Sequence, residues 1–240
     1  MMERLVEGAR DLRLPLTEHQ LQQFQTYYEQ LMEWNRRVNL TGITDYDEVQ
    51  VKHFVDSLSI DLTLEGATWA DGNFALLDIG TGAGMPGIPL KILHPAARLV
   101  LLDSVTKKTA FLRHVVEELA LTEVEILTQR AENVGHLSGY RDRFDLVVCR
   151  AVSQLATVAE LTLPFCRTGG LSVIPKKDGI EDELSQANAA ISILGGKLRT
   201  VQQVAVKGLE QHLLVVLEKT SPTPANYPRR PGIPTKRPLR

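Results

Sequence analysis

The chain has few cysteines and no long apolar run. Cys149 and Cys166 are its only cysteines, and their spacing matches no metal-ligand motif, so we expect no metal site and a reducing compartment. No apolar stretch approaches the roughly 18 residues of a membrane-spanning helix. The N-terminus also lacks the charged-then-apolar layout of a secretion signal. We therefore expect a cytoplasmic protein with no membrane contact.

Acidic and basic residues nearly balance, but they are distributed unevenly. The formal net charge is −2, and it divides into +5 on residues 220–240 and −7 on the rest of the chain. The basic segment holds six prolines and no acid, so we expect neither a helix nor an inner strand there. A basic, proline-stiffened tail indicates contact with a phosphate backbone, and a solvated, disordered end is the alternative.

A glycine-rich run after an apolar segment is the most informative motif. Residues 77–79 are typical of a buried strand, and residues 80–87 contain four glycines. Glycine has no Cβ, so it permits a tight turn and a close approach of the backbone to a ligand. The run therefore predicts a ligand-binding turn at the end of a strand.

Two ligand templates fit this turn. Residues 82–87 match the G-x-G-x-x-G motif of dinucleotide-binding folds, with Asp103 about 20 residues later as a ribose-binding acid. Residues 78–84 match the acidic-x-G-x-G-x-G pattern of S-adenosylmethionine-dependent methyltransferases. In that template Asp78 lies near the cationic methionine amino group or its bound waters, whereas it would repel a pyrophosphate. Asp103 can accept both ribose hydroxyls in either template.

Strand and helix patterns alternate after the turn. We expect strands at 98–103, 124–128, 143–150 and 170–175, and helices at 106–120, 154–164 and 181–194. This alternation predicts an α/β protein with a doubly wound, mostly parallel sheet. Two β-rich runs at 197–206 and 212–219 are joined by a short turn and predict a hairpin. A reversed last strand is typical of the seven-stranded, Rossmann-like class I methyltransferase fold, and it favours S-adenosylmethionine over a nicotinamide or flavin.

The region before the sheet is helical in pattern. Residues 17–20 form a capping box that begins a helix to about residue 34, and a second helix is expected at 45–62. His53 lies on that second helix, where a structural role is favoured over a catalytic one. We expect three parts: an N-terminal helical extension (1–66), an S-adenosylmethionine-binding domain (67–219) and a basic proline-rich tail (220–240).

Two specific blocks are His53-x-x-Asp-Ser-Leu58 and the extension Gly87-Ile-Pro-Leu90 of the glycine run. Further short blocks lie at 39–41, 102–113, 130–132, 149–151, 175–176 and 227–239. Together these blocks cover nearly the whole chain, and they resemble the ribosomal small subunit methyltransferase G family, also called glucose-inhibited division protein B. The resemblance implies methyl transfer from S-adenosylmethionine to N7 of guanine 527, in the 530 loop of 16S rRNA in the 30S ribosomal subunit. A monomer is the default expectation.

The resemblance also implies site residues. Met85 stands where Leu or Phe is common in the family, and it keeps an unbranched apolar contact. Lys176 matches a family lysine near the substrate face, and Lys177 replaces a common glycine, which leaves the shape of that loop open. Arg150 and Lys176 are the expected catalytic residues, with positioning roles. The expected cofactor-binding residues are Asp78, Gly80, Gly82, Gly84, Met85, Asp103, Ala131, Glu132 and Arg150.

The chemistry fits a chain without a catalytic triad. Guanine N7 has an in-plane lone pair that is unprotonated at neutral pH, so it needs no general base, and alignment alone can supply roughly 7–11 kcal/mol. The Asn-Pro-Pro-Tyr loop of exocyclic amino methylation is missing, and Cys149 lacks the Pro-Cys context of pyrimidine C5 methylation, so we expect it to be a buried hydrophobe.

Arg150 is expected to hold the cofactor, guanine O6 or a phosphate, because a donor on N7 would occupy the attacking lone pair. The alternative for Arg150 is a structural salt bridge to Asp78 or Glu132. Two other function classes stay open for the chain as a whole. One is a methyltransferase that acts on a small molecule or a protein, and the other is a non-catalytic ribosome-assembly factor.

Overall fold

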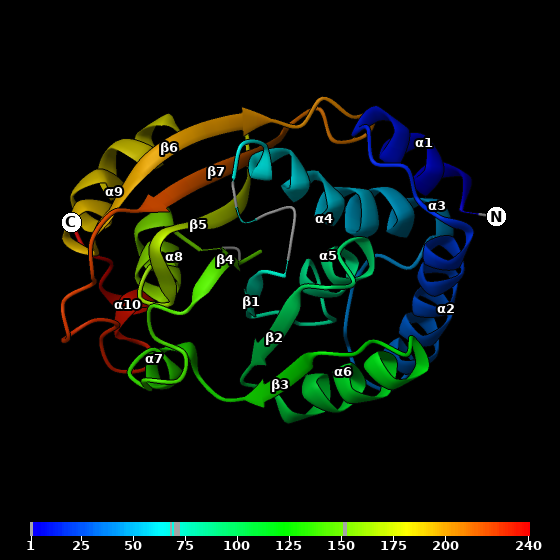
Figure 1. Ribbon diagram of the computed structural model, residues 1–240, viewed down its shortest axis with the longest axis horizontal. Coiled ribbons are helices and arrows are strands. Elements are labelled where there is room, and N and C mark those ends of the chain that lie inside the picture. The colour runs from blue at the N-terminus through cyan, green and yellow to red at the C-terminus, as the bar shows by residue number, and fades with distance from the viewer. Residues whose placement is uncertain (1, 68, 70–72, 151–152) are drawn as a thin grey trace.

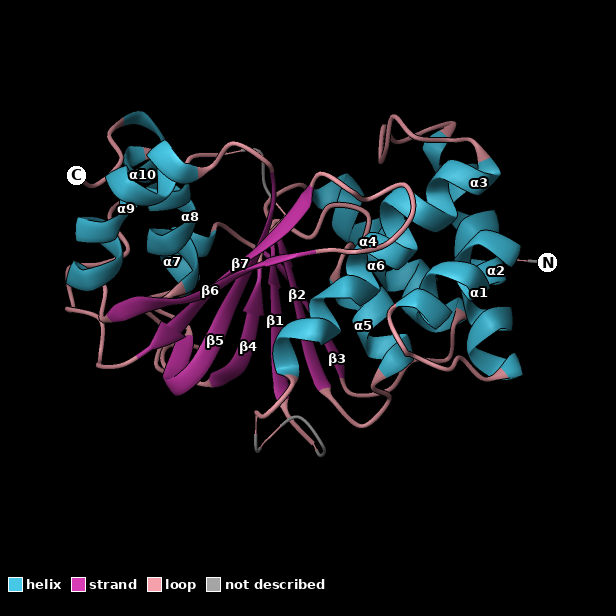
Figure 2. Ribbon diagram, turned by 90° about the horizontal axis from the view of Figure 1, so that it is seen from above, coloured by secondary structure: helices cyan, strands magenta, loops and turns pink. Residues whose placement is uncertain are grey.

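The computed structural model describes residues 2–67, 69, 73–150 and 153–240, and it forms a central sheet between two helical layers (Figures 1 and 2). Ala151, which belongs to one of the family-like blocks, lies outside the described residues. No helix among the described residues is long and apolar enough to cross a membrane.

The sheet has seven strands in the order β3-β2-β1-β4-β5-β7-β6. Strands β1 to β5 are parallel, and β7 is antiparallel to both of its neighbours, so the predicted fold class and terminal hairpin are confirmed. The strands are β1 (Ala75–Ile79), β2 (Arg98–Asp103), β3 (Val124–Thr128), β4 (Phe144–Val148), β5 (Cys166–Lys177), β6 (Gly196–Gln203) and β7 (His212–Lys219).

Strand β1 is central and apolar on both faces because helices cover both sides of the sheet. Successive side chains of a strand point to opposite faces, so Leu76 packs into one hydrophobic core and Leu77 into the other. One layer contains α5 (Gly87–Leu93), α6 (Thr106–Glu118) and the N-terminal helices. The opposite layer contains α7 (Ala131–Val134), α8 (Leu155–Thr162), α9 (Glu181–Ile193) and α10 (Ile233–Lys236).

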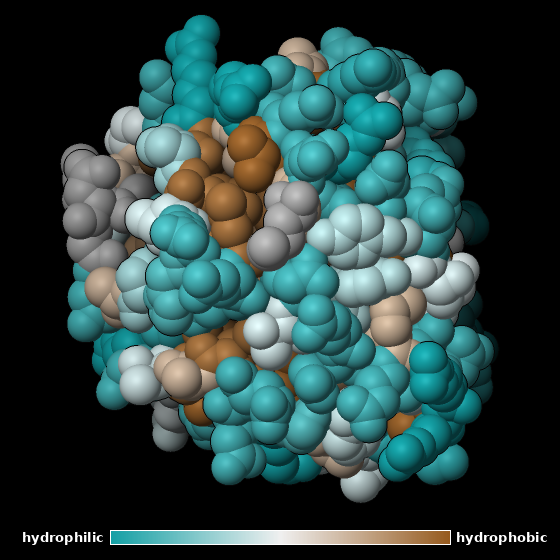
Figure 3. Space-filling view, turned by 90° about the vertical axis from the view of Figure 1, so that its right-hand side faces the viewer, coloured by the Kyte–Doolittle hydropathy of each residue, from teal (hydrophilic) through white to brown (hydrophobic). Residues whose placement is uncertain are grey.

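The N-terminal helices α1 (Glu3–Asp11) and α2 (Glu18–Asn35) pack on the sheet domain. The predicted capping box is confirmed, because the Thr17 hydroxyl accepts the Gln20 N–H and the Gln20 side chain accepts the Thr17 N–H. Buried side chains of α2 share one hydrophobic core with β1 and β2. The side of the molecule that carries the N-terminal helices is mostly hydrophilic, with one larger apolar patch and several smaller ones (Figure 3).

The helix expected at 45–62 is present but is not uniform. It consists of α3 (Tyr46–Val49), a π-helical segment (Gln50–Val55), α4 (Asp56–Leu58) and a 3-10 segment (Ser59–Leu64). π-Helical segments are frequent at functional sites. Here the π segment carries His53 and leads directly into Asp56, and both side chains contact Arg150.

The expectation that the proline-rich tail contains no helix is wrong. Residues 233–236 form the one-turn helix α10, with Pro234 in its first turn. Proline is tolerated there because the first N–H groups of a helix have no intrahelical partner. The tail folds back along α7 and α8, and the alternative of a solvated, disordered end is therefore also wrong (Figure 1).

Candidate cofactor and substrate site

The glycine-rich turn connects β1 to α5 in a conformation that requires glycine. Gly80, Gly82 and Gly84 have φ angles of 68°, 60° and 94°, in the region that favours residues without a Cβ. A Cβ on Gly80 would meet no atom within 4 Å, whereas one on Gly84 would lie 2.4 Å from Ile88 Cδ1. The first glycine therefore borders open space, and the third is required by packing.

Asp78 is fully buried at the end of β1. Its Oδ2 accepts hydrogen bonds from Thr81 Oγ1 at 2.6 Å and from Gly87 N at 2.8 Å. Among the described residues, Oδ1 has no hydrogen-bond partner, and burial raises the pKa of Asp78 to about 6. A buried acceptor without a partner requires an explanation, and a hydrogen-bond donor from a bound group would supply one. The site therefore fits a cationic group such as the S-adenosylmethionine ammonium.

Asp103 lies at the end of β2 and ties that strand to the glycine turn. Its Oδ2 accepts the Gly82 N–H at 3.0 Å, and its Oδ1 accepts the Val105 N–H at 2.9 Å. Each carboxylate oxygen has a second lone pair, so the side chain keeps the capacity to accept ribose hydroxyls.

The remaining predicted cofactor residues flank these two acids. Ala131 and Glu132 begin α7, which follows β3, and Met85 is buried within the glycine turn. Glu132 Oε1 accepts the Gly232 N–H of the tail at 2.8 Å. The carboxyl ends of β1, β2 and β3 share one edge of the sheet, where open α/β sheets bind ligands. The structure thus brings these predicted residues to one edge.

Tyr27 is a contact to this edge that the sequence did not reveal. It is fully buried on α2, and its hydroxyl donates to Ala83 O at 2.5 Å. Burial, followed by the charge of Asp78, raises the pKa of Tyr27 well above its ordinary value, so the hydroxyl stays a donor. A tyrosine at helical spacing is typical of a core position, and no local signal distinguishes it from one.

Arg150 follows β4 and points to the N-terminal extension. Its guanidinium donates to Asp56 Oδ2 and to Lys52 O, both at 3.2 Å, and lies 3.3 Å from His53 Nδ1. Asp56 is 4% exposed, and its other oxygen lies 2.7 Å from His212 Nδ1. The structure thus places one buried carboxylate between an arginine and a histidine.

This arrangement corrects the alternative interpretation of Arg150. The predicted salt-bridge partners, Asp78 and Glu132, are wrong, because the π segment brings Asp56 to the end of β4. Burial and the charge of Arg150 lower the pKa of His53 to about 4. His53 is therefore neutral at neutral pH and acts as a hydrogen-bonding group, with Thr41 Oγ1 2.8 Å from its Nε2.

A cavity of about 1280 Å³ lies beside Arg150, at the ends of β4 and β5. Lys176 lines it and donates to Glu183 Oε1 and to Ser153 O, both at 2.6 Å. Lys177 is an exposed cation at its rim. The cavity therefore joins the two predicted catalytic residues, Arg150 and Lys176. Its further polar lining residues include Lys52, His53, Asp56, Glu183 and His212.

The sequence missed Asp56, Glu183 and His212 in this cavity. The block His53-x-x-Asp-Ser-Leu58 contained the signal for Asp56, whereas Glu183 and His212 have no motif. Cys149 is buried as predicted. Among the residues that the structure describes, no cluster of histidine, cysteine, aspartate or glutamate is arranged to hold a metal ion.

Solved structures share the fold. The structure is similar to MtNAS in complex with MTA and tNA, with a TM-score of 0.54 and 16% identity, over 82% of this chain and 74% of that chain. It is also similar to M. jannaschii TYW2 in complex with AdoMet, with a TM-score of 0.51 and 16% identity, over 67% of this chain and 75% of that chain. At these identities the likeness establishes the Rossmann-like fold alone.

Sequence relatives are much closer. A protein of Dehalococcoides mccartyi named ribosomal RNA small subunit methyltransferase G is 50% identical over 239 residues, which are 99% of this chain and 100% of that protein. A protein of the same name from Roseiflexus castenholzii is 47% identical over 238 residues, with 99% and 100% coverage. The family model described as rRNA small subunit methyltransferase G matches residues 20–214. The chain therefore belongs to the rRNA small subunit methyltransferase G family.

Proposed function

We propose that the protein transfers the methyl group of S-adenosylmethionine to N7 of guanine 527 in the 530 loop of 16S rRNA. The supporting observation is the buried carboxylate of Asp78, whose Oδ1 lacks a hydrogen-bond partner among the described residues, beside a glycine turn with open space at Gly80. The protein is a methyltransferase that uses S-adenosylmethionine, and its substrate is rRNA.

S-adenosylmethionine supplies an electrophilic methyl group on a sulfonium centre. Asp78 would accept hydrogen bonds from the ammonium, and the free lone pairs of Asp103 would accept from the ribose hydroxyls. Met85, Ala131 and Glu132 would line the pocket, as the family resemblance implies. These residues bind and orient the cofactor, and none of them needs to move a proton.

We assign the target nucleotide to the cavity beside Arg150. The volume of this cavity is about 1280 Å³, above the range of about 300–1,000 Å³ that is typical of small-molecule pockets. The cavity therefore has room for a segment of RNA. Lys177 at the rim suits a phosphate contact, and such contacts fix register without reading sequence.

Positioning replaces acid–base catalysis in this proposal. Guanine N7 needs no general base, and His53, whose pKa is lowered to about 4, is neutral at working pH. Asp56 and His53 fix the guanidinium of Arg150, which we assign to guanine O6, a phosphate or the cofactor. Lys176 is fixed in the same way by Glu183 of α9, and it also donates to Ser153 O in the segment before α8.

The finer features of the proposal concern the assembly. We propose a cytoplasmic monomer that acts on the 30S subunit or a precursor of it. We also propose that the chain has three parts, which are residues 1–66, 67–219 and 220–240. The first part supports the glycine turn, and the last part lies along α7 and α8.

The test uses S-adenosylmethionine with a tritiated methyl group and 30S subunits from a strain that lacks the protein. Nucleoside analysis of the 16S rRNA should recover the label as 7-methylguanosine from the 530 loop. Subunits from a strain that contains the protein are the control, and they should take up little label because the site is already methylated. Cofactor binding without transfer to RNA would overturn the proposal and point to a small-molecule or protein acceptor.

A further inference from the structure

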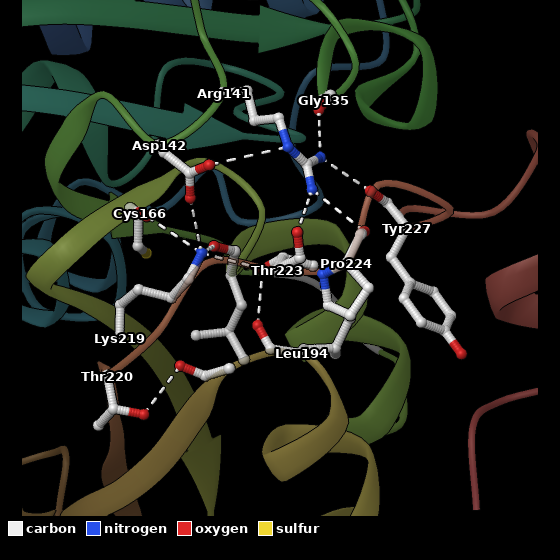
Figure 4. A network of polar contacts seen from close by, with 12 residues as sticks. Gly135, Arg141, Asp142, Cys166, Leu194, Lys219, Thr220, Thr223, Pro224 and Tyr227 are labelled. Atoms are coloured by element: carbon white, nitrogen blue, oxygen red, sulfur yellow. Dashed lines mark hydrogen bonds and ion pairs between the residues drawn. The ribbon is translucent and has the colours of Figure 1, made fainter.

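The C-terminal tail is held by a polar network that begins at Arg141 (Figure 4). The Arg141 guanidinium donates to Gly135 O and Tyr227 O at 2.8 Å and to Thr223 O at 2.7 Å. A fourth contact joins it to Pro224 O at 3.2 Å. One side chain thus joins the segment after α7 to the first turns of the tail.

Lys219, at the end of β7, makes the second anchor. Its ammonium is fully buried and donates to Asp142 Oδ1, Thr223 Oγ1 and two backbone carbonyls at 2.6–3.2 Å. Thr223 Oγ1 donates in turn to Leu194 O at 2.6 Å (Figure 4). The start of the tail is therefore fixed in place by buried charge.

Arg229 makes the third anchor, against α8. It pairs with Glu160, which is 0% exposed, through its backbone N–H, Nε and Nη2 at 2.6–3.1 Å. The hydrogen bonds to Glu160 raise the pKa of Arg229. A buried carboxylate thus balances the charge of Arg229, whereas Arg230 beside it is an exposed cation.

The anchored tail passes the predicted cofactor edge at Gly232 and then continues along α8. Gly232 N donates to Glu132 Oε1 at 2.8 Å, and Pro234 O accepts from Thr157 Oγ1 at 3.0 Å. Glu132 is 7% exposed and lies on α7, a helix of a single turn that cannot fix its own position. The tail supplies the hydrogen bond that orients this carboxylate.

We propose that residues 227–236 are part of the cofactor site and set the affinity for S-adenosylmethionine by positioning Glu132. The inference rests on the proposed function in one respect, which is that Glu132 contacts the cofactor. Gly232 and Arg229 are positioning residues. The tail is therefore chiefly an intramolecular brace, and its exposed cations such as Arg230 suit a phosphate contact.

The decisive variants are Gly232→Val and Gly66→Val in the full chain. Both glycines have positive φ, 81° and 75°, and a Cβ on either would meet no atom within 4 Å. The two substitutions therefore impose the same backbone strain at different places. Gly66 follows the 3-10 segment and lines a cavity with His94, which lies at the C-terminal end of α5, the end away from the glycine turn.

Binding of S-adenosylmethionine is measured by calorimetry without RNA, beside the thermal midpoint. We expect the Kd of Gly232→Val to rise about tenfold, as for weakening a hydrogen bond to a charged group, with Gly66→Val unchanged. An unchanged Kd for Gly232→Val overturns the proposal. So does a loss of affinity for a 16S rRNA fragment with normal cofactor binding, because that result assigns the tail to RNA alone.

A second pair of variants decides the matter if Gly232→Val does not fold. Arg229→Gln breaks the contact with Glu160, and Arg230→Gln removes the same charge from an exposed neighbour. The proposal requires weaker cofactor binding in the first variant only, and equal Kd values contradict it. If the parent protein binds the cofactor but does not methylate 30S subunits, the proposed function fails, and these Kd values still decide the inference.

Discussion

Replacing Tyr27 by phenylalanine removes one buried hydroxyl and keeps the ring. The hydroxyl donates to Ala83 O at 2.5 Å, within the glycine turn, and both residues are buried. A net hydrogen bond is worth about 1 kcal/mol, and an unsatisfied buried carbonyl costs more, so the free energy of unfolding should fall by about 1–3 kcal/mol. At about 2–4 °C per kcal/mol for a chain of this size, the thermal midpoint should fall by about 5 °C.

The same variant tests whether α2 preorganises the turn for its ligand. Without the Tyr27 anchor the turn gains conformational freedom that binding must remove, so we expect the Kd for S-adenosylmethionine to rise about three- to tenfold. Calorimetric titration gives the Kd, and chemical denaturation followed by circular dichroism gives the stability.

Tyr28→Phe is the matched control. It is the same substitution on the next residue, where the hydroxyl donates to Thr44 O in a long, exposed contact at 3.4 Å. We expect a stability change within about 0.5 kcal/mol and an unchanged Kd. Equal effects of the two substitutions would refute the reasoning, since the buried contact would then carry no special free energy.

Three further predictions concern charged groups. Because burial raises the pKa of Asp78 to about 6 and a cationic ligand favours the ionised form, affinity for S-adenosylmethionine should fall about tenfold per pH unit below about pH 6. Calorimetry from pH 7 to 5 tests this, and Asp78→Asn should abolish the dependence. Lys219→Met should cost at least about 2 kcal/mol in chemical denaturation because it leaves buried carbonyls without a donor. Lys197→Met, on a 57% exposed side chain, should cost less than about 0.5 kcal/mol. Arg150→Ala should lower tritium transfer to 30S subunits at least about tenfold through lost positioning, and normal transfer with normal cofactor affinity would contradict its role.

Local patterns predicted the sheet well. The strands expected at 98–103 and 124–128 have those same bounds in the structure, and the terminal hairpin is antiparallel as expected. These segments are short apolar runs bounded by clear turn signals. Such runs are typical of parallel strands that helices cover on both faces, so few other secondary structures fit them. The glycine turn was also predictable from the sequence, because the positive φ angles at Gly80, Gly82 and Gly84 favour glycine there.

The partners of the site residues were not predictable in the same way. Arg150 pairs with Asp56, 94 positions away, and Glu132 pairs with Gly232, 100 positions away. Such contacts depend on how separate elements pack, and no local periodicity encodes them. The tail shows a related limit, because proline content describes what a segment cannot form in isolation, whereas α10 exists through contacts with α8.

The two ends of the chain support different parts of the same sheet edge. Tyr27 holds the turn after β1 by donating to Ala83 O, and Gly232 holds α7 after β3 by donating to Glu132 Oε1. The effects of substitutions at independent sites on a free energy add. We therefore expect the double variant Tyr27→Phe, Gly232→Val to change the binding free energy for S-adenosylmethionine by the sum of the two separate changes, within about 0.5 kcal/mol. A larger coupling in calorimetry would mean that the turn and α7 move as one unit. Additivity would mean that each end of the chain contributes separately to a cofactor site whose ligand-binding side chains lie between them.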